Sequence, residues 1–101
     1  MDLNLKNKIV IITGASRGIG KSISEKMAIN GSKIVMISRK LSDLETVKNN
    51  INSKNVMCFE ADVRNYNQLQ KISETVFQKW GNIDILVNNA GITKDKILLR
   101  L

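Results

Sequence analysis

The eight residues TGASRGIG, at positions 13–20, place three glycines, a serine and an arginine between an apolar run and a helical pattern. Amide groups at the start of a helix have no partner within the helix, and the helix dipole adds positive potential there, so that they bind anions. We expect Gly14 to make the turn, Gly18 to let a phosphate approach the backbone, and Gly20 to let the helix lie close to the sheet. The pattern predicts a loop that binds pyrophosphate; a tight turn without a ligand is the alternative.

Cationic residues follow the second predicted strand, in the order Ser38, Arg39, Lys40. A carboxylate at this point of a dinucleotide-binding fold bonds the ribose 2′-OH of NAD(H), whereas a cation accommodates the 2′-phosphate of NADP(H). Arg17 can approach the same phosphate from the glycine loop, and its planar guanidinium suits phosphate. Asp43 comes only later, in the first turn of the next predicted helix. We therefore predict NADP(H), with Ser38 and Arg39 in its site; the alternative is that Arg39 and Lys40 are solvated charges.

A proton donor for carbonyl reduction is not evident among these residues. Hydride transfer to a carbonyl needs such a donor beside the developing alkoxide. The chain has no histidine, and its one tyrosine, Tyr66, is expected to be a partly buried helix residue. Its one cysteine, Cys58, lies in an apolar run with no histidine to activate it. We assign no catalytic residue and no metal site to the 101 residues.

The elements that must position these residues alternate along the chain. Apolar, β-branched runs predict strands at residues 8–13, 33–38, 55–60 and 83–87, and helical patterns lie between them. Such alternation predicts a parallel sheet with right-handed crossovers. The fold class expected is α/β, the N-terminal half of a doubly wound Rossmann-type fold with strand order 3-2-1-4. One incomplete dinucleotide-binding domain would occupy residues 1–101.

Helix ends and helix faces can be predicted from local patterns. Ser42 with Glu45 reads as a capping box, and Asn65 with Gln68 as a second cap pair. Asn30-Gly31 and Gly81 should end the first and third helices, and Thr93 should begin a fourth helix. Apolar stripes for the three helices are Ile19, Ile23, Met27 and Ala28; Leu44, Val47 and Ile51; and Leu69, Ile72, Val76, Phe77 and Trp80.

The spacing T-G-x-x-x-G-x-G of the loop resembles the short-chain dehydrogenase/reductase family. "NNAG" at positions 88–91 is similar to that family's second signature, and "ADV" at 61–63 to its adenine-contacting position. The resemblance implies a cofactor-binding role for three groups of residues. They are Gly14, Ser16, Arg17, Ile19 and Gly20 along the pyrophosphate and ribose; Asp62 and Val63 at the adenine; and Asn89, Ala90 and Gly91 along the adenosine ribose and towards the nicotinamide.

The last residues, GITKDKILLRL, resemble the corresponding stretch of 3-oxoacyl-(acyl-carrier-protein) reductases. This implies NADPH-dependent reduction of a 3-oxoacyl thioester in fatty-acid synthesis, with the acyl carrier protein as partner and a homo-oligomer, a tetramer in the family, as the assembly. The family's catalytic serine, tyrosine and lysine would lie beyond residue 101, so the chain is expected to be an N-terminal fragment. Alternatives are another short-chain reductase acting on an alcohol or a sugar, and an NADP(H)-binding remnant without turnover.

Composition and hydropathy argue against nucleic-acid binding, a membrane span and secretion. The net charge of +7 is spread along the chain, and aromatic residues make up only 4%, so a nucleic-acid-binding surface is not favoured. No apolar run is long enough to span a bilayer, and the N-terminus does not resemble a signal peptide. We expect a cytoplasmic protein without nucleic-acid or membrane partners.

Overall fold

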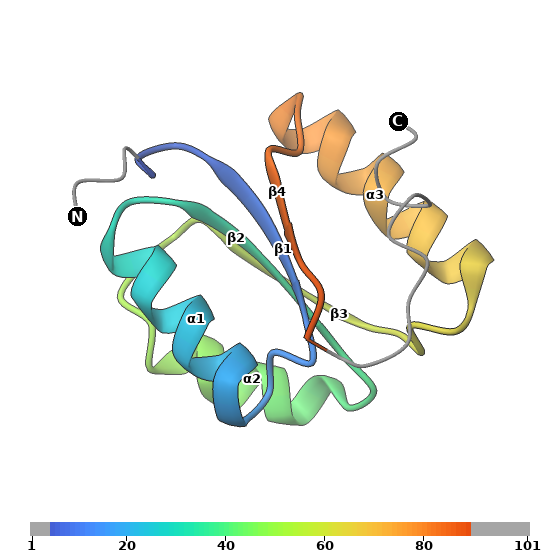
Figure 1. Cartoon of the computed structure of the whole chain (residues 1–101), viewed down its shortest axis with the longest axis horizontal. Helices are drawn as coiled ribbons and strands as arrows, with labels where there is room; N and C mark the ends of the chain where they lie inside the picture. Colours follow the sequence, from blue (N-terminus) through green and yellow to red (C-terminus); the bar gives the residue numbers. More distant parts are fainter. Residues whose placement is uncertain (1–4, 90–101) are drawn as a thin grey trace.

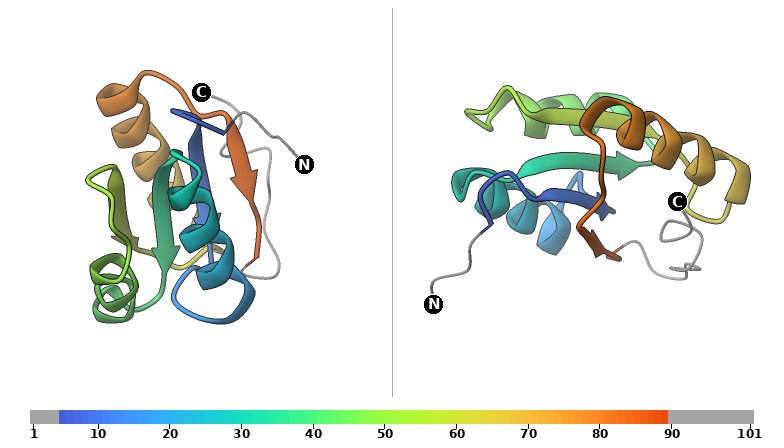
Figure 2. Two further views of the ribbon diagram at one scale, coloured as in Figure 1. Left: turned by 90° about the vertical axis from the view of Figure 1, so that its left-hand side faces the viewer. Right: turned by 90° about the horizontal axis from the view of Figure 1, so that it is seen from above.

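The computed structural model describes residues 5–89, in which strands and helices alternate. The strands are β1 (Ile9–Thr13), β2 (Lys33–Ser38), β3 (Val56–Glu60) and β4 (Ile85–Val87). The helices are α1 (Gly18–Ile29), α2 (Leu41–Asn49) and α3 (Tyr66–Trp80). The strands form one parallel sheet in the order β3-β2-β1-β4 (Figures 1 and 2). The predicted α/β class and strand order are confirmed.

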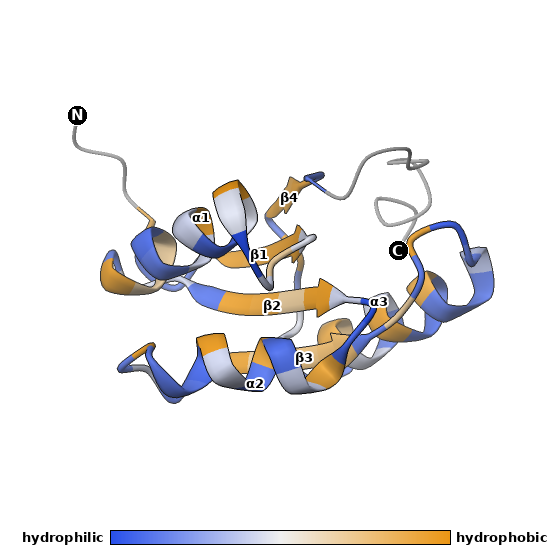
Figure 3. Ribbon diagram, turned by 90° about the horizontal axis from the view of Figure 1, so that it is seen from below, coloured by the Kyte–Doolittle hydropathy of each residue, from blue (hydrophilic) through white to orange (hydrophobic). Residues whose placement is uncertain are grey.

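Helices cover both faces of the sheet: α1 and α2 lie on one side and α3 on the other (Figure 1). Successive side chains of a strand point to opposite faces, so each strand needs apolar residues at every position. In β1, Ile9 and Ile11 pack toward α3, whereas Val10 and Ile12 pack toward α1 and α2. The strands are accordingly hydrophobic along most of their length, whereas the helices carry hydrophilic residues on their outer faces (Figure 3). Packing on both faces holds the sheet in place, and the carboxyl ends of its strands therefore have defined positions.

The apolar stripes of the helices are confirmed except at two positions. Ile23, Met27 and Ala28 of α1 pack against the core, but Ile19 in its first turn is 69% exposed. In α3, Phe77 is 45% exposed. A helix turns by about 100° per residue, so Phe77 lies roughly a quarter of a turn from the centre of the buried face. That face consists of Leu69, Ile72, Ser73 and Val76.

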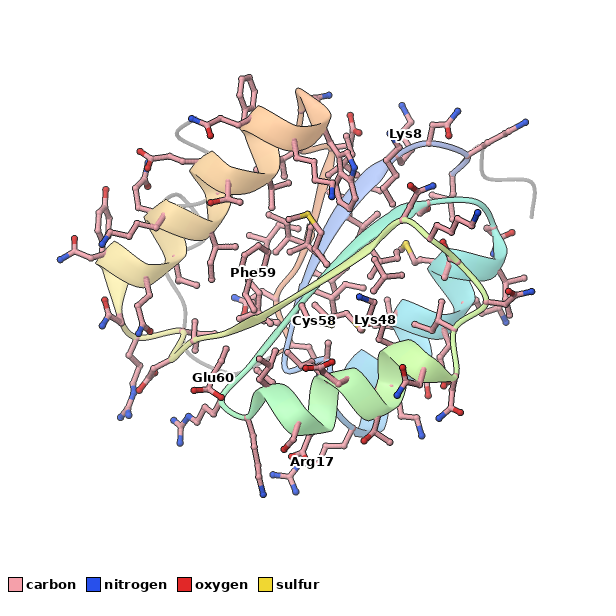
Figure 4. All side chains as sticks on the ribbon, turned by 180° about the vertical axis from the view of Figure 1, so that it is seen from behind. Lys8, Arg17, Lys48, Cys58, Phe59 and Glu60 are labelled. Atoms are coloured by element: carbon pink, nitrogen blue, oxygen red, sulfur yellow. The ribbon has the colours of Figure 1, made fainter. Side chains whose placement is uncertain are left out.

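One predicted cap is confirmed and the other is wrong. Asn65 precedes α3, and its Oδ1 accepts a hydrogen bond from the Gln68 N–H at 3.1 Å. Helix α2, however, begins at Leu41, so that Ser42 lies inside its first turn and no side chain of its N-cap residue, Lys40, caps it. The Leu41 N–H instead donates to Glu60 Oε1 at 3.0 Å. Glu60 belongs to β3 and lies near the start of α2 (Figure 4).

The remaining differences concern the ends of elements. The first strand begins one residue later than predicted, at Ile9; the third begins at Val56; and the fourth begins two residues later, at Ile85. Asp84, just before β4, accepts a hydrogen bond from the Ile9 N–H at 2.9 Å through Oδ2. Tyr66, expected to be partly buried, is exposed at the first position of α3.

Helix α3 ends at Gly81, whose φ of 78° lies in the left-handed region, as predicted for this glycine. Helix α1 ends at Ile29, with Asn30 as its C-cap residue and Gly31 beyond it at φ 87°. The helix predicted from Thr93 lies outside the described residues. Among residues 5–89, no helix is long and apolar enough to cross a membrane.

Candidate functional site

The loop between β1 and α1 turns sharply at two glycines. Gly14 and Gly18 have φ angles of 61° and 59°, a region that side chains with a Cβ rarely adopt. Between them, the Ala15 N–H donates to the Ile37 carbonyl at 3.3 Å, and the Ala15 side chain is buried. The loop is therefore fixed to the end of β2 while its glycines bend the chain away from the sheet.

Among residues 5–89, no side chain caps the free amide groups at the start of α1. Arg17, the residue before the helix, is extended and makes no capping hydrogen bond, and the first turn contains no acidic residue. In most helices a serine, threonine, aspartate or asparagine would accept from these N–H groups. Because none does so here, the amides and the positive end of the helix dipole are available to an anion.

Gly20 joins the glycine loop to the chain segment that follows β4. A Cβ atom at Gly20 would collide with the Gly14 carbonyl and would lie 2.7 Å from Asn89 Nδ2. Asn89 is itself fixed, because its N–H donates to Thr13 Oγ1 at 3.0 Å and its Nδ2 to the Gly14 carbonyl at 3.4 Å. The residue types at these positions thus bring two segments, separated by about seventy residues of sequence, into contact beside the sheet.

A hollow of about 580 Å³ opens at the carboxyl ends of the strands. The glycine loop forms one wall, the turn from β2 into α2 forms a second, and the residues after β3 and β4 complete it. Its lining residues are Gly14, Ser16, Arg17, Gly18, Ile19, Ser38, Arg39, Lys40, Asp43, Ala61, Val63 and Asn89.

Most residues predicted from the sequence for the cofactor site line this hollow. Gly20 lies in the first turn of α1, close to the Gly14 carbonyl. Asp62 lines a shallower depression formed with Arg64, Asn65, Tyr66 and Asn67. Ala90 and Gly91 lie outside the described residues. Those predicted residues that line the hollow are Gly14, Ser16, Arg17, Gly18, Ile19, Ser38, Arg39, Val63 and Asn89.

Among the described residues, three that line the hollow were not in the predicted set: Lys40, Asp43 and Ala61. Lys40 and Ala61 are next to predicted residues in the sequence. Because each follows the carboxyl end of a strand, where ligands bind in parallel sheets, the sequence could have indicated them. Asp43 lies in the first turn of α2, as predicted, and this turn borders the hollow. Arg17, Arg39 and Lys40 contribute positive charge to the lining, and Asp43 contributes negative charge.

The side chain of Ser38 shapes the turn that carries Arg39. Its hydroxyl donates to the Lys40 carbonyl at 3.2 Å and accepts from the Lys40 N–H at 3.3 Å. Together with the bond from Leu41 to Glu60, these contacts hold both ends of the cationic turn. The positions of Arg39 and Lys40 at the hollow therefore depend on local hydrogen bonds as well as on the sheet.

The two residues considered for other chemistry lie elsewhere. Cys58 is partly buried with Lys48 nearby, on the face of the sheet opposite to Phe59 (Figure 4), and burial raises the pKa of its thiol. Tyr66 begins α3 beside the shallower depression. Within residues 5–89 no cluster of histidine, cysteine, aspartate and glutamate is arranged to hold a metal ion.

Comparison with known proteins matches this architecture to one family. A family model described as short chain dehydrogenase matches residues 8–101. The chain is 35% identical over 101 residues to the 3-oxoacyl-[acyl-carrier-protein] reductase of Escherichia coli, covering 98% of this chain and 40% of the relative. It is 36% identical over 95 residues to an uncharacterized oxidoreductase of Staphylococcus saprophyticus, covering 94% and 39%. The chain thus spans about 40% of the length of the curated relatives it matches.

Solved structures of short-chain dehydrogenases and reductases have the same fold as this chain. A short chain dehydrogenase from Bacillus anthracis superposes with a TM-score of 0.83 at 39% identity, over 87% of this chain and 36% of that one. L-Sorbose reductase from Gluconobacter frateurii, complexed with NADPH and L-sorbose, gives 0.82 at 35%, over 91% and 36%. The 3-ketoacyl-(acyl-carrier-protein) reductase from Brucella melitensis, complexed with NADH, gives 0.80 at 34%, over 87% and 36%. The strand order, the glycine loop and these matches together show that the chain belongs to the short-chain dehydrogenase family of oxidoreductases.

Proposed function

We propose that this chain binds NADP(H) and forms the cofactor-binding part of a short-chain reductase. The observation that carries the proposal is the hollow at the carboxyl ends of the strands, which combines the uncapped start of α1 with a cationic turn after β2. In open α/β sheets, ligands bind outside the carboxyl ends of the strands where the chain reverses its direction of winding. Here that point lies between β1 and β4, which are adjacent in the sheet.

The residues present fit a phosphorylated dinucleotide. A Cβ at Gly18 would meet no atom within 4 Å, so the space above the loop is open for a pyrophosphate at the start of α1. Arg17 and Arg39 line the same hollow and would hold the 2′-phosphate, partly opposed by Asp43. Val63 offers an apolar contact for the adenine.

On the other side, Asn89 would lie along the adenosine ribose, followed by Ala90 and Gly91, which lie outside the described residues. Asn89 already lines the hollow and is held against the glycine loop by its bonds to Thr13 and Gly14. These three residues would extend the site toward the nicotinamide.

The proposed reaction is the reduction of a 3-oxoacyl-(acyl-carrier-protein) thioester to the 3-hydroxyacyl form. When bound, NADPH supplies a hydride to the 3-oxo carbon, the carbonyl oxygen takes up a proton, and NADP⁺ is released. The described residues would bind and orient the cofactor, and no proton donor is assigned among them. Support comes from the similarity to acyl-carrier-protein reductases, at 35% identity over nearly the whole chain. We further propose that the full-length protein is a cytoplasmic homo-oligomer.

A second candidate is a reductase of sugars or other small carbonyl compounds, favoured by the 35% identity to the L-sorbose reductase structure. Turnover distinguishes the candidates: NADPH oxidation with an acetoacetyl thioester but not with sugars supports the first, and the opposite result supports the second. Binding of NADPH without turnover of any carbonyl compound would identify a cofactor-binding remnant.

The cofactor preference is tested by the substitution Arg39→Asp in the full-length protein. We expect the ratio of NADH to NADPH dissociation constants to fall by about tenfold or more, because a charge-assisted bond to phosphate is lost and a carboxylate that suits the ribose hydroxyl is gained. Isothermal titration calorimetry with each cofactor measures the ratio. The matched control is Lys54→Asp, which makes the same charge reversal at an exposed position before β3. An unchanged ratio in the Arg39 variant would contradict the assignment of NADP(H).

A further inference from the structure

The carboxylate of Asp62, directly after β3, is held by Arg64 through three hydrogen bonds. Arg64 Nε donates to Oδ1 at 3.1 Å and Nη2 donates to Oδ2 at 2.8 Å, so that the guanidinium and the carboxylate meet as two parallel forks. The Arg64 backbone N–H also donates to Oδ1, at 2.9 Å. Exposed ion pairs contribute little in general, but a bidentate arginine–carboxylate pair is the geometry that does hold a side chain in place.

The main chain of Asp62 is fixed as well. Its N–H donates to Gln68 Oε1 at 3.0 Å, and its carbonyl accepts from the Asn65 N–H at 2.8 Å. Asn65 and Gln68 are the residues that cap the start of α3. The position of Asp62 is therefore determined by the beginning of the helix, and its side-chain orientation is determined by Arg64.

Asp62 lies between two residues that line the hollow, and it interacts electrostatically with a third, Arg39. Its neighbours Ala61 and Val63 line the hollow, and Asp62 itself lines the adjoining depression together with Arg64 and Tyr66. An ionised carboxylate offers about four acceptor positions. Arg64 occupies two on Oδ1 and one on Oδ2, which leaves one position on Oδ2 for a donor from a ligand.

We infer that Arg64 is a positioning residue for recognition of the nucleotide base: it holds the Asp62 carboxylate in one orientation, with its remaining acceptor position available to the exocyclic amino group of adenine. This inference rests on the proposed function, because it requires that the hollow binds an adenine dinucleotide. A base with a carbonyl oxygen in place of that amino group would face the carboxylate with a second acceptor and would bind more weakly.

Protonation of Asp62 gives a readout that distinguishes positioning from a structural effect. The hydrogen bonds from Arg64 hold the pKa of Asp62 well below its usual range, and the positive charge of Arg39 acts in the same direction. A lowered pKa means that the carboxylate stays ionised as the pH falls through the ordinary aspartate value of about 3.9. Without Arg64 the pKa rises, so selection for the amino group is lost at a higher pH.

The test uses the full-length protein and two probes: NADPH, and its hypoxanthine analogue, in which oxygen replaces the amino group. Fluorescence titration gives the two dissociation constants and their ratio between pH 7 and pH 4. We expect the unaltered protein to favour NADPH by about tenfold, the size of one hydrogen bond to a charged group. Arg64→Gln should reduce the ratio several-fold at pH 7 and lower it further at pH 4, where about half of the Asp62 carboxylates would be protonated if their pKa returned to the ordinary value.

Two further variants separate charge from geometry. Lys71→Gln removes one positive charge from the exposed side of α3 and should leave the ratio unchanged. Arg64→Lys keeps the charge but not the planar fork, and should lose part of the preference. A ratio in Arg64→Gln equal to that of the unaltered protein, or greater than it, would overturn the inference, since a greater ratio would mean that Arg64 competes with the base. Failure to bind either probe would overturn the proposed function, and the inference with it.

Discussion

At the scale of single residues, Gly20 shows how the site depends on a missing side chain. Its Cα lies so close to the Gly14 carbonyl and to Asn89 that a methyl group cannot be accommodated unless the backbone moves. The sequence predicted this close approach, because a third glycine in such a loop lies where the helix meets the sheet. It did not predict Asp43 at the hollow, because a place in the first turn of a helix does not by itself say which neighbouring segment the side chain faces.

Gly20→Ala should therefore weaken both folding and cofactor binding. We expect a loss of about 1–3 kcal/mol in the free energy of unfolding, as for an overpacked core, and a weaker affinity for NADPH, because the glycine loop must shift. Urea denaturation and calorimetric titration of the full-length protein measure the two effects.

The control is Gly81→Ala, at a left-handed position where no atom lies within 4 Å of an added Cβ. It should destabilise the protein by roughly 1–2 kcal/mol through backbone strain alone, with NADPH affinity unchanged. Equal effects of the two substitutions on affinity would show that the contact at Gly20 has no part in binding.

At the scale of elements, the two N-terminal caps show where local sequence is sufficient. Asn65 and the start of α3 follow from the residues around them, and the structure confirms the cap. The pattern Ser42–Glu45 is equally good as a sequence, yet α2 begins before it, and an acceptor from β3, Glu60, satisfies the Leu41 N–H. Leu41 and Glu60 are nineteen residues apart, so a pattern of four residues cannot predict the hydrogen bond between them. Phe77 is a similar case, since the small buried Ser73 occupies the face that hydrophobicity alone would have given to the aromatic ring.

The caps can be compared directly by two substitutions. Asn65→Ala should cost about 1 kcal/mol of stability, because it removes the acceptor for the Gln68 N–H. Ser42→Ala should change stability by less than about 0.5 kcal/mol, as for a surface substitution that removes no cap. Urea denaturation midpoints and slopes of the two variants check this. If Ser42→Ala lowered stability as much as Asn65→Ala, Ser42 would cap α2 after all, contrary to the structure.

At the scale of the whole molecule, the strand order gathers the carboxyl ends of all four strands near one hollow. This order was predictable because strands alternating with helices allow few right-handed parallel arrangements. The residues that line the hollow were harder to predict, because four separate segments of the described chain meet there. These are the glycine loop, the β2–α2 turn, the residues after β3, and Asn89. A ligand held by all of these segments should stabilise the fold as a unit.

Binding should accordingly raise the stability of the full-length protein. NADPH at 100 times its dissociation constant is expected to increase the free energy of unfolding by about 2.7 kcal/mol, and NADH at the same concentration by clearly less. Thermal denaturation with each cofactor measures the difference, with nicotinamide mononucleotide as the control that lacks the adenosine part. Equal shifts for the two dinucleotides would argue against a contribution from the 2′-phosphate.

The pairing of β1 with β4 has a further consequence for how the molecule is made. β2 pairs with both β1 and β3 across short crossovers, whereas the bonds that tie Ile9 to Asp84 and Thr13 to Asn89 close loops of 75 and 76 residues. Closing a loop of that length costs about 1 kcal/mol more in entropy than closing the β1–β2 crossover, so we expect these contacts to form later. On the ribosome, β1 must wait for β4 to emerge before its second edge is covered. The glycine loop is thus translated well before Asn89, the residue after β4 that lines the hollow beside it.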